Sequence, residues 1–215
     1  MMTTAMNNPI KCKLCNDRKY VLVMEKWKPC KCLLEFKKLH IYKQAGIPPF
    51  FITYTWGEFI KDYKKMSRNY KISKACVEAA KKHRRMKLMF ILGEAQSGKQ
   101  AFTCLMLKDF IAAGLTAKFI TLDELIQLEF DKDRREELKD IYEECDIVCL
   151  RIGTIKEHSY TRYVLEKFIN ARKNNNKYGI ITSRLDMETN AGLFGKEVCA
   201  MMSDGRRAIK IEMRT

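Results

Sequence analysis

The sequence predicts an α/β protein in which a parallel sheet is flanked by helices and preceded by a small cysteine-bearing module. Three observations support this prediction. A glycine-rich loop directly follows an apolar run at residues 89–92. Strand-like apolar segments alternate with helical patterns from there to residue 213, which is the order of a parallel sheet covered on both faces. Two close pairs of cysteines crowd the first 32 residues.

The cysteine pairs have the spacing of a four-thiolate metal site. A C-x-x-C pair and a C-x-C pair are separated by fourteen residues, and the strand pattern Tyr20–Met24 lies between them, so a hairpin can bring the pairs together. Thiolates in this arrangement favour a structural Zn²⁺, since the segment is too small to fold on a core of its own. The C-x-C pair is tighter than usual, which leaves His40 as a reserve ligand. The candidate ligands are Cys12, Cys15, Cys30 and Cys32.

The net charge of +15 lies entirely before the glycine-rich loop. Residues 1–87 carry 21 Lys+Arg against 6 Asp+Glu, whereas residues 88–215 carry 20 of each. A segment this basic attracts phosphate backbones or an acidic protein surface; the alternative is a lysine-rich face that is merely solvated. Because no apolar run approaches the ~18 residues of a membrane span and Met1–Pro9 lack a secretory signal pattern, we expect a cytoplasmic protein with no membrane partner.

The segment between the cysteines and the loop combines a basic helix, an aromatic stretch and a second basic helix. Leu33–Gln44 predict the first helix, which the prolines at 48 and 49 end. The aromatic residues of 50–59 favour packing against the larger domain over base stacking. Ser73–Lys87 predict the second helix, whose basic end either contacts nucleic acid or is solvated. The candidate nucleic-acid contacts there are Lys81, Lys82, Arg84 and Arg85.

The glycine-rich loop matches seven of the eight positions of a P-loop, Gly-x-x-x-x-Gly-Lys-[Ser/Thr]. In such a loop the backbone amides cradle phosphates, the lysine reaches the outer phosphates, and the final hydroxyl binds Mg²⁺. Here Gln100 replaces the hydroxyl residue. The preceding strand pattern and the apolar helix predicted for Ala101–Ala113 are the expected flanks. The candidate nucleotide-binding residues are Gly93, Ser97, Gly98, Lys99 and Gln100.

The remaining elements follow in alternation. Strands are predicted at 117–121, 146–150, 178–183 and 208–213. Helices are predicted at 122–144 and 158–174, with short helices around Leu193 and Val198.

This order of features resembles the bacterial and phage replicative-helicase loaders of the DnaC/DnaI type, an AAA+ branch, over residues 10–213. The markers are the cysteine pairs, Ala45-Gly46-Ile47-Pro48, the P-loop, Thr121–Leu125, Asn170-Ala171-Arg172, Ile181-Thr182-Ser183 and Phe194-Gly195. The resemblance implies three regions. Residues 1–45 would be a zinc-binding, partner-binding module, 46–86 a basic joint with the N-terminal part of the AAA+ region, and 87–215 an AAA+-like P-loop domain.

The same resemblance shows where the catalytic set of the family is missing. The family places two acids after the third strand of the sheet, for Mg²⁺ and for the attacking water. Alignment on Gly153 puts Leu150 and Arg151 at these positions, and alignment on Asp146 puts Arg151 and Ile152 there. Either alignment leaves no carboxylate.

Two further family positions also differ. The asparagine that senses the nucleotide is replaced by Arg184. The arginine that reaches a neighbouring subunit's nucleotide falls near Met201, although Arg206 and Arg207 lie close by in the sequence. The sequence therefore predicts negligible ATP hydrolysis, because phosphoryl transfer depends on this positioning and charge stabilisation. Weak, metal-independent binding of ATP or ADP and no nucleotide binding both stay open, and Mg²⁺ is not expected.

In this family the N-terminal module grips the hexameric replicative helicase, and the AAA+ domain binds ATP and single-stranded DNA. We therefore expect a degenerate helicase-loader-like DNA-replication protein that binds the helicase, and single-stranded DNA, without hydrolysing ATP. It would load the helicase, or regulate the helicase or a competent loader. The alternatives are an active ATPase in which Gln100 and an acid such as Glu94 or Glu157 hold Mg²⁺, and a nucleic-acid-binding protein on an AAA+ scaffold.

Overall fold

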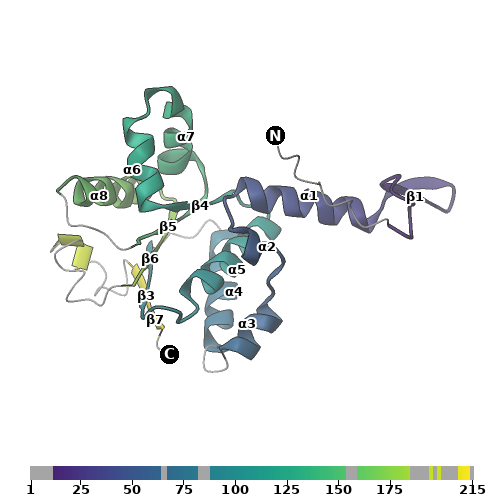
Figure 1. Cartoon of the computed structure of the whole chain (residues 1–215), viewed down its shortest axis with the longest axis horizontal. Coiled ribbons are helices and arrows are strands. Elements are labelled where there is room, and N and C mark those ends of the chain that lie inside the picture. Colours follow the sequence, from purple (N-terminus) through teal and green to yellow (C-terminus); the bar gives the residue numbers. More distant parts are fainter. Residues whose placement is uncertain are drawn as a thin grey trace, which may run out of the picture. The chain divides into compact units, whose positions relative to one another are not determined.

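The computed structural model describes residues 12–63, 67–81, 88–153, 159–184, 194–195, 198–199 and 208–213. The chain divides into two compact units, residues 1–44 and 45–215. Figure 1 labels the helices and strands of both.

The N-terminal unit consists of a hairpin and a helix. Strands β1 (Tyr20–Val23) and β2 (Lys26–Pro29) pair antiparallel. Met24 and Glu25 form the two-residue turn between them, both with positive φ, at 50° and 61°, which matches the twist of the strands. Helix α1 (Lys31–Gln44) follows directly. The predicted strand and helix are thus both present.

The second unit is built on a five-stranded parallel sheet in the order β4-β5-β6-β3-β7. The predicted parallel sheet is confirmed, and the P-loop strand β3 lies inside it between β6 and β7. Because all strands are parallel, their carboxyl ends lie at one edge, where ligands of open α/β sheets bind. The strands are β3 (Leu88–Gly93), β4 (Ala117–Thr121), β5 (Ile147–Arg151), β6 (Tyr178–Ser183) and β7 (Ala208–Met213).

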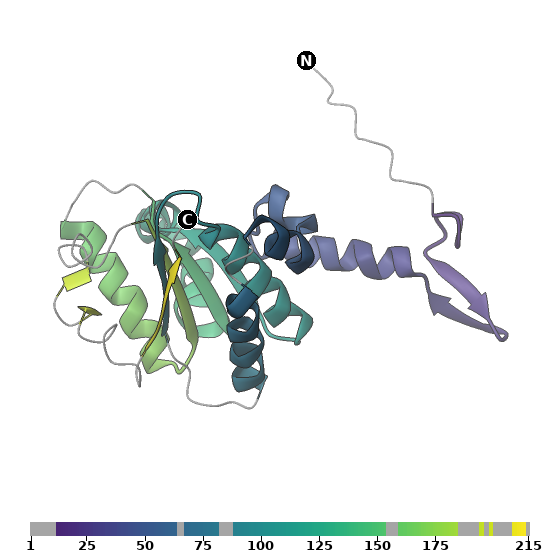
Figure 2. The same cartoon turned by 90° about the horizontal axis from the view of Figure 1, so that it is seen from below.

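Helices cover both faces of this sheet, as Figure 2 shows with the strands seen nearly edge-on. One face carries α5, against which α2, α3 and α4 pack; the other carries α6 and α8, which contact each other. The bounds on the first face are α2 (Pro49–Thr53), α3 (Trp56–Asp62), α4 (Ser67–Lys81) and α5 (Lys99–Ala112). The others are α6 (Leu122–Phe130), α7 (Arg135–Lys139) and α8 (Ser159–Asn174).

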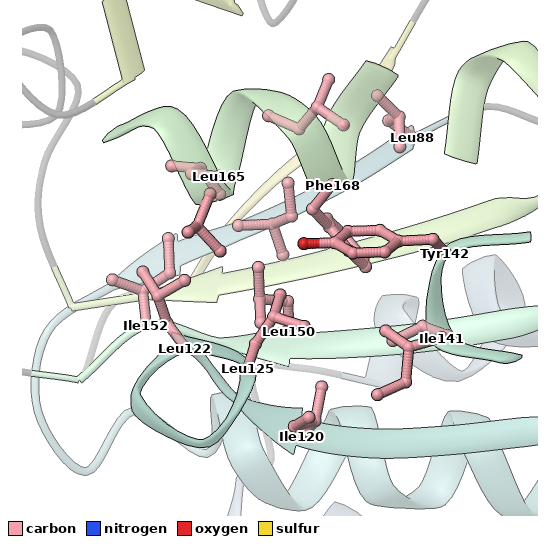
Figure 3. Close-up of a cluster of buried hydrophobic side chains, with 14 of the residues drawn as sticks. Leu88, Ile120, Leu122, Leu125, Ile141, Tyr142, Leu150, Ile152, Leu165 and Phe168 are labelled. Carbon is pink, nitrogen blue, oxygen red and sulfur yellow. The ribbon is translucent and has the colours of Figure 1, made fainter. Parts of the chain in front are cut away.

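One hydrophobic core lies between the sheet and α6 and α8. Alternate residues of β3, Leu88, Phe90 and Leu92, belong to it, because successive side chains of a strand point to opposite faces. Figure 3 shows Leu165 and Phe168 of α8 filling the space above the strands.

The single long helix predicted for 122–144 is wrong. Helix α6 ends at Phe130, and a 3₁₀ turn (Lys132–Arg134), α7 and a π-helical turn (Asp140–Glu144) follow. The break occurs at Asp131, whose carboxylate accepts a hydrogen bond from the Asp133 amide at 3.0 Å, a local bond that competes with the helical ladder. The π-helical turn buries Ile141 and Tyr142. Burial of these two side chains offsets the loss of regular helix.

Candidate functional site

The P-loop is shaped by two glycines that no other residue can replace without strain. Gly93 ends β3 with a φ of +152°, and a Cβ there would lie 2.0 Å from the carbonyl oxygen of Met213 in β7. Gly98 precedes α5 with a φ of +81°, and a Cβ there would lie 2.9 Å from the Tyr63 ring. The loop therefore requires glycine for both conformation and space, and it leaves the N-terminus of α5 at the sheet edge.

The Lys99 amine is turned onto the loop itself. Its Nζ donates hydrogen bonds to the carbonyl oxygen of Gly93 at 2.7 Å, to the Ser97 hydroxyl at 3.0 Å, and to the carbonyl oxygen of Glu94. Only 9% of Lys99 is exposed. Burial, reinforced by the nearby Arg184 and opposed by Glu94, lowers the pKa of Lys99 to about 8. A buried cation in contact with the loop carbonyls gains stabilisation from any anion that enters.

The loop forms one side of a cavity of about 370 Å³ at the carboxyl edge of the sheet. Two sets of side chains line it. The cationic set consists of Lys99, Arg151 at the end of β5, and Arg184 just after β6. The aromatic wall comes from the segment before the sheet and consists of Phe50, Phe51, Tyr54 and Tyr63.

The aromatic wall is fixed to α5 through Lys108. Its Nζ donates to the carbonyl oxygens of Phe51, Ile52 and Tyr54 at 3.1, 3.0 and 2.5 Å, so it satisfies the open carbonyls at the end of α2. The Tyr54 hydroxyl donates to Asp62 at 2.5 Å. Burial and this carboxylate raise the pKa of Tyr54, so it is a neutral donor at physiological pH.

Not all residues predicted to replace the catalytic set reach the cavity. Arg151 and Ile152 line it, which matches the alignment on Asp146, whereas Leu150 is fully buried in the core between the sheet and α6 and α8. Arg184 lines the mouth and is exposed. Three other positions singled out from the sequence, Met201, Arg206 and Arg207, lie outside the described residues, as does Glu157.

The residues at this cavity do not fit a Mg²⁺ ion. Mg²⁺ requires oxygen ligands, usually carboxylates and phosphates. Gln100, in the first turn of α5, is half-buried at the cavity, and the position where an acid would follow β5 holds Arg151. Asp62 supplies the carboxylate of the described lining. It lies in the same segment as the aromatic wall and already accepts a hydrogen bond from the Tyr54 hydroxyl.

The sequence did not identify the aromatic wall as part of this cavity. It predicted packing for the aromatic stretch, and Trp56 and Phe59 do pack on Phe102 of α5 with ring centroids 5.8 and 6.1 Å apart. Phe50 and Tyr54 instead face the cavity. The stretch folds as two short helices joined by two extended residues. This arrangement places some of the aromatic side chains in the core and others at the cavity. No spacing in the sequence distinguishes the two groups.

The four N-terminal cysteines converge as predicted. Their sulfur atoms lie within 4.8 Å of one another, with the Cys12 and Cys30 sulfurs 3.7 Å apart and those of Cys15 and Cys32 3.4 Å apart. Tetrahedral Zn²⁺ with Zn–S of about 2.3 Å places sulfurs ~3.8 Å apart. The donor set therefore fits a structural zinc ion.

The loop around the first cysteine pair is arranged for a thiolate. Backbone amides of Cys15 and Leu14 donate toward the Cys12 sulfur and lower its pKa to about 7. The Cys12 backbone amide donates a hydrogen bond to the Asp17 carboxylate, with 2.8 Å between nitrogen and oxygen. His40, the reserve ligand, lies exposed on α1 and is not part of the cysteine group.

The predicted basic cluster is described only at its start. Lys81 is the last residue of α4, and Lys82, Arg84 and Arg85 lie outside the described residues.

Comparison with known proteins identifies the fold. No family model matches the chain, and no curated protein matches it. Among solved structures, the DnaC helicase loader superposes with a TM-score of 0.58 at 18% identity, over 68% of this chain and 88% of that chain. DnaI superposes with a TM-score of 0.56 at 16% identity, over 75% and 87%.

A structure of the replication initiator DnaA bound to AMPPCP and single-stranded DNA superposes with a TM-score of 0.57 at 15% identity, over 70% of this chain and 46% of that one. This chain thus spans about half the length of that initiator structure. The chain has the AAA+ P-loop fold of DnaC-type loaders, preceded by a cysteine cluster that fits a metal. None of the helices in the described part is long and apolar enough to cross a membrane.

Proposed function

We propose that this chain is a helicase-loader-like DNA-replication protein that acts by binding a replicative helicase and does not hydrolyse ATP. The observation that carries the proposal is the composition of the cavity: a P-loop on the loader fold shares a cavity with Arg151 and Arg184, which stand in place of the groups that bind Mg²⁺ and activate water. Phosphoryl transfer obtains nearly all its catalysis from such groups. The P-loop that could hold a nucleotide is present, and the described lining lacks the groups that ATP hydrolysis requires.

The exposed surface of the N-terminal unit supports a partner-binding role. Among the described residues, ten of the fourteen exposed large apolar side chains lie between Leu14 and Ile41, including Met24 at 91% and Trp27 at 65%. Residues 1–44 also carry 10 Lys+Arg against 3 Asp+Glu. Apolar groups concentrated on one small unit mark an interaction surface, and their basic surroundings favour an acidic partner face.

The first test combines native mass spectrometry with phosphate release. The zinc-loaded chain is mixed with the replicative helicase of its source organism, and bound stoichiometry and released phosphate are measured with and without single-stranded DNA. We expect the chain to decorate the helicase ring and to release no phosphate above the level of Lys99→Ala. Phosphate release that Lys99→Ala abolishes would contradict the proposal.

A matched pair of variants tests the surface. Trp27→Ser removes an apolar side chain that is 65% exposed in the N-terminal unit, and Phe130→Ser removes one that is 69% exposed in the second unit. We expect Trp27→Ser to weaken helicase binding at least about tenfold, as for an aromatic anchor, and Phe130→Ser to leave it unchanged. Equal effects of the two variants would show that the N-terminal unit is not the contact.

A further inference from the structure

We propose that the cavity binds a nucleoside polyphosphate in its metal-free form and that Mg²⁺ weakens this binding, the reverse of an ordinary P-loop. This inference rests on the proposed function, because it concerns the same site and assumes no hydrolysis. The guanidinium groups of Arg151 and Arg184 would take the place that a metal ion has in a hydrolysing relative. Three features of the cavity support it: its charge, its lack of metal ligands, and its combination of cationic and aromatic lining residues.

The charge of the cavity is positive and not neutralised from within. Lys99, Arg151 and Arg184 line it against one carboxylate, Asp62, which leaves a surplus of two positive charges in the described lining. No ion pair or side-chain hydrogen bond joins the guanidinium of Arg151 or Arg184 to any residue that the structure describes. Elsewhere in the second unit exposed cations do pair, as Arg162 does with Glu166 at 2.9 Å. Two unpaired guanidiniums beside a buried amine are a site for a polyanion.

The arrangement opposes a divalent ion. A Mg²⁺ that entered with the phosphates would meet these cations at short range, where like charges repel. It would also cancel part of the phosphate charge that the guanidiniums recognise. Arg151 is fixed in position because its strand pairs on both sides, with Thr121 of β4 and Thr182 of β6, so its backbone cannot withdraw from the cavity. The metal complex is therefore the poorer ligand.

The aromatic wall of the cavity selects the rest of the ligand. The Phe50 side chain is 72% exposed, and its ring stacks on that of Tyr54 with the ring centroids 5.9 Å apart. An aromatic face that is not used in core packing is therefore open. A base that stacks on such a side chain binds more tightly. A cationic set and an aromatic wall in one cavity match a molecule with a polyphosphate and a base, and a cavity of about 370 Å³ is within the range of small-molecule sites.

Isothermal titration calorimetry of the full zinc-loaded chain tests this inference, with ATP, ATP plus excess MgCl₂, and inorganic tripolyphosphate as probes. The buffer is freed of metal by resin, since a soluble chelator would also attack the cysteine cluster, and ionic strength is matched with NaCl. We expect ATP to bind on the order of tenfold more tightly without Mg²⁺ than with it. Equal or tighter binding of the Mg²⁺ complex would overturn the proposal, as would the absence of ATP binding.

Two variants and one control assign the effect to the cationic and the aromatic parts of the lining. Arg151→Gln should weaken metal-free ATP binding about tenfold and remove the difference between ATP and its Mg²⁺ complex. Phe50→Ser should weaken ATP about tenfold and leave tripolyphosphate unchanged. Arg135→Gln removes one charge from the exposed surface of α7 and should change neither. Tripolyphosphate binding as tight as ATP would refute the role given to the base.

The helicase experiment separates this inference from the proposed function. If ATP binds only with Mg²⁺ while the chain still decorates the helicase without turnover, the inference alone fails. If the chain ignores the helicase yet prefers metal-free ATP, the proposed function fails and the inference stands.

Discussion

The two units of this protein bury their apolar side chains to very different extents. Between residues 12 and 44 the buried hydrophobic residues are Cys15, Cys30, Leu33 and Tyr42. The second unit buries both faces of β3 and most of α5, together with a contiguous cluster contributed by β5, α6 and α8. The same chain thus contains a segment with almost no core and a domain with a complete one.

This difference indicates that the units are stabilised by different means. A domain with a large core is held by burial of apolar area, whereas a segment of about 40 residues usually needs disulfides, metals or a partner. In the N-terminal unit the cysteine cluster is the candidate for that role. Its apolar side chains remain at the surface, where a partner can reach them. Three perturbations test the comparison.

Metal removal should produce the largest difference. We expect a strong zinc chelator to abolish amide protection of the β1–β2 hairpin completely, because apparent zinc-binding free energies of about 10–16 kcal/mol are folding free energies in such modules. Protection of β3, β5 and β6 should not change. The measurement is hydrogen exchange by mass spectrometry, with zinc release monitored alongside. A hairpin that stays protected after zinc is lost would show that the metal is not its main support.

Arg172→Met should destabilise the second unit by about 3 kcal/mol. The Arg172 guanidinium is fully buried and donates to the carbonyl oxygens of Tyr178 at 2.7 Å, Asp146 at 2.9 Å and Ile141 at 3.1 Å. Methionine fills the space and removes these donors, although the Asp146 carbonyl keeps the Tyr178 amide as a donor at 3.0 Å. Each buried group left unsatisfied costs about 1–3 kcal/mol. Urea unfolding followed by circular dichroism measures the change.

The exposed Arg135→Met variant serves as its control and should stay within about 0.5 kcal/mol of the parent. Similar losses for the two variants would mean that the buried carbonyls find other donors.

Trp27→Ser should have the smallest effect on stability, within about 0.5 kcal/mol, because the indole is mostly exposed and a surface substitution changes little buried area. Zinc content and hairpin protection should equal those of the parent chain. The loss of helicase binding expected for the same variant would then come from the surface and not from unfolding. A marked loss of zinc or of hairpin protection would place Trp27 in the fold of the unit.

The sequence predicted the fold where local pattern and tertiary packing agree. Strands at 117–121, 178–183 and 208–213 have the predicted bounds, because short segments rich in apolar and β-branched residues between turn signals are typical of strands. The prediction failed at 122–144, where charged residues with high helix propensity gave no sign of the break at Asp131. Helix α4 begins at Ser67, six residues before the predicted Ser73, which shows how poorly propensity defines helix ends.

The candidate site was predictable on one side only. The P-loop and the positions of Arg151 and Arg184 follow from motifs with fixed spacing along the chain. The aromatic wall does not, since Phe50 and Tyr63 come from a segment that precedes the loop by 30 residues or more and reach it through packing on α5. The cysteine cluster was fully predictable, because metal ligands require a specific residue type at a short spacing.

The position of β3 inside the sheet has a consequence for the order of events during synthesis. Its two neighbours, β6 and β7, lie roughly 90 and 120 residues later in the chain. All four cysteines of the N-terminal unit have been made by residue 32. Synthesis proceeds at about 5–20 residues per second. A nascent chain can therefore acquire its metal on the order of ten seconds before Gly93 of the P-loop meets β7, the strand that packs against it. The segment with almost no core is therefore ready first, and for that interval a partner can engage it while the larger domain is still being translated.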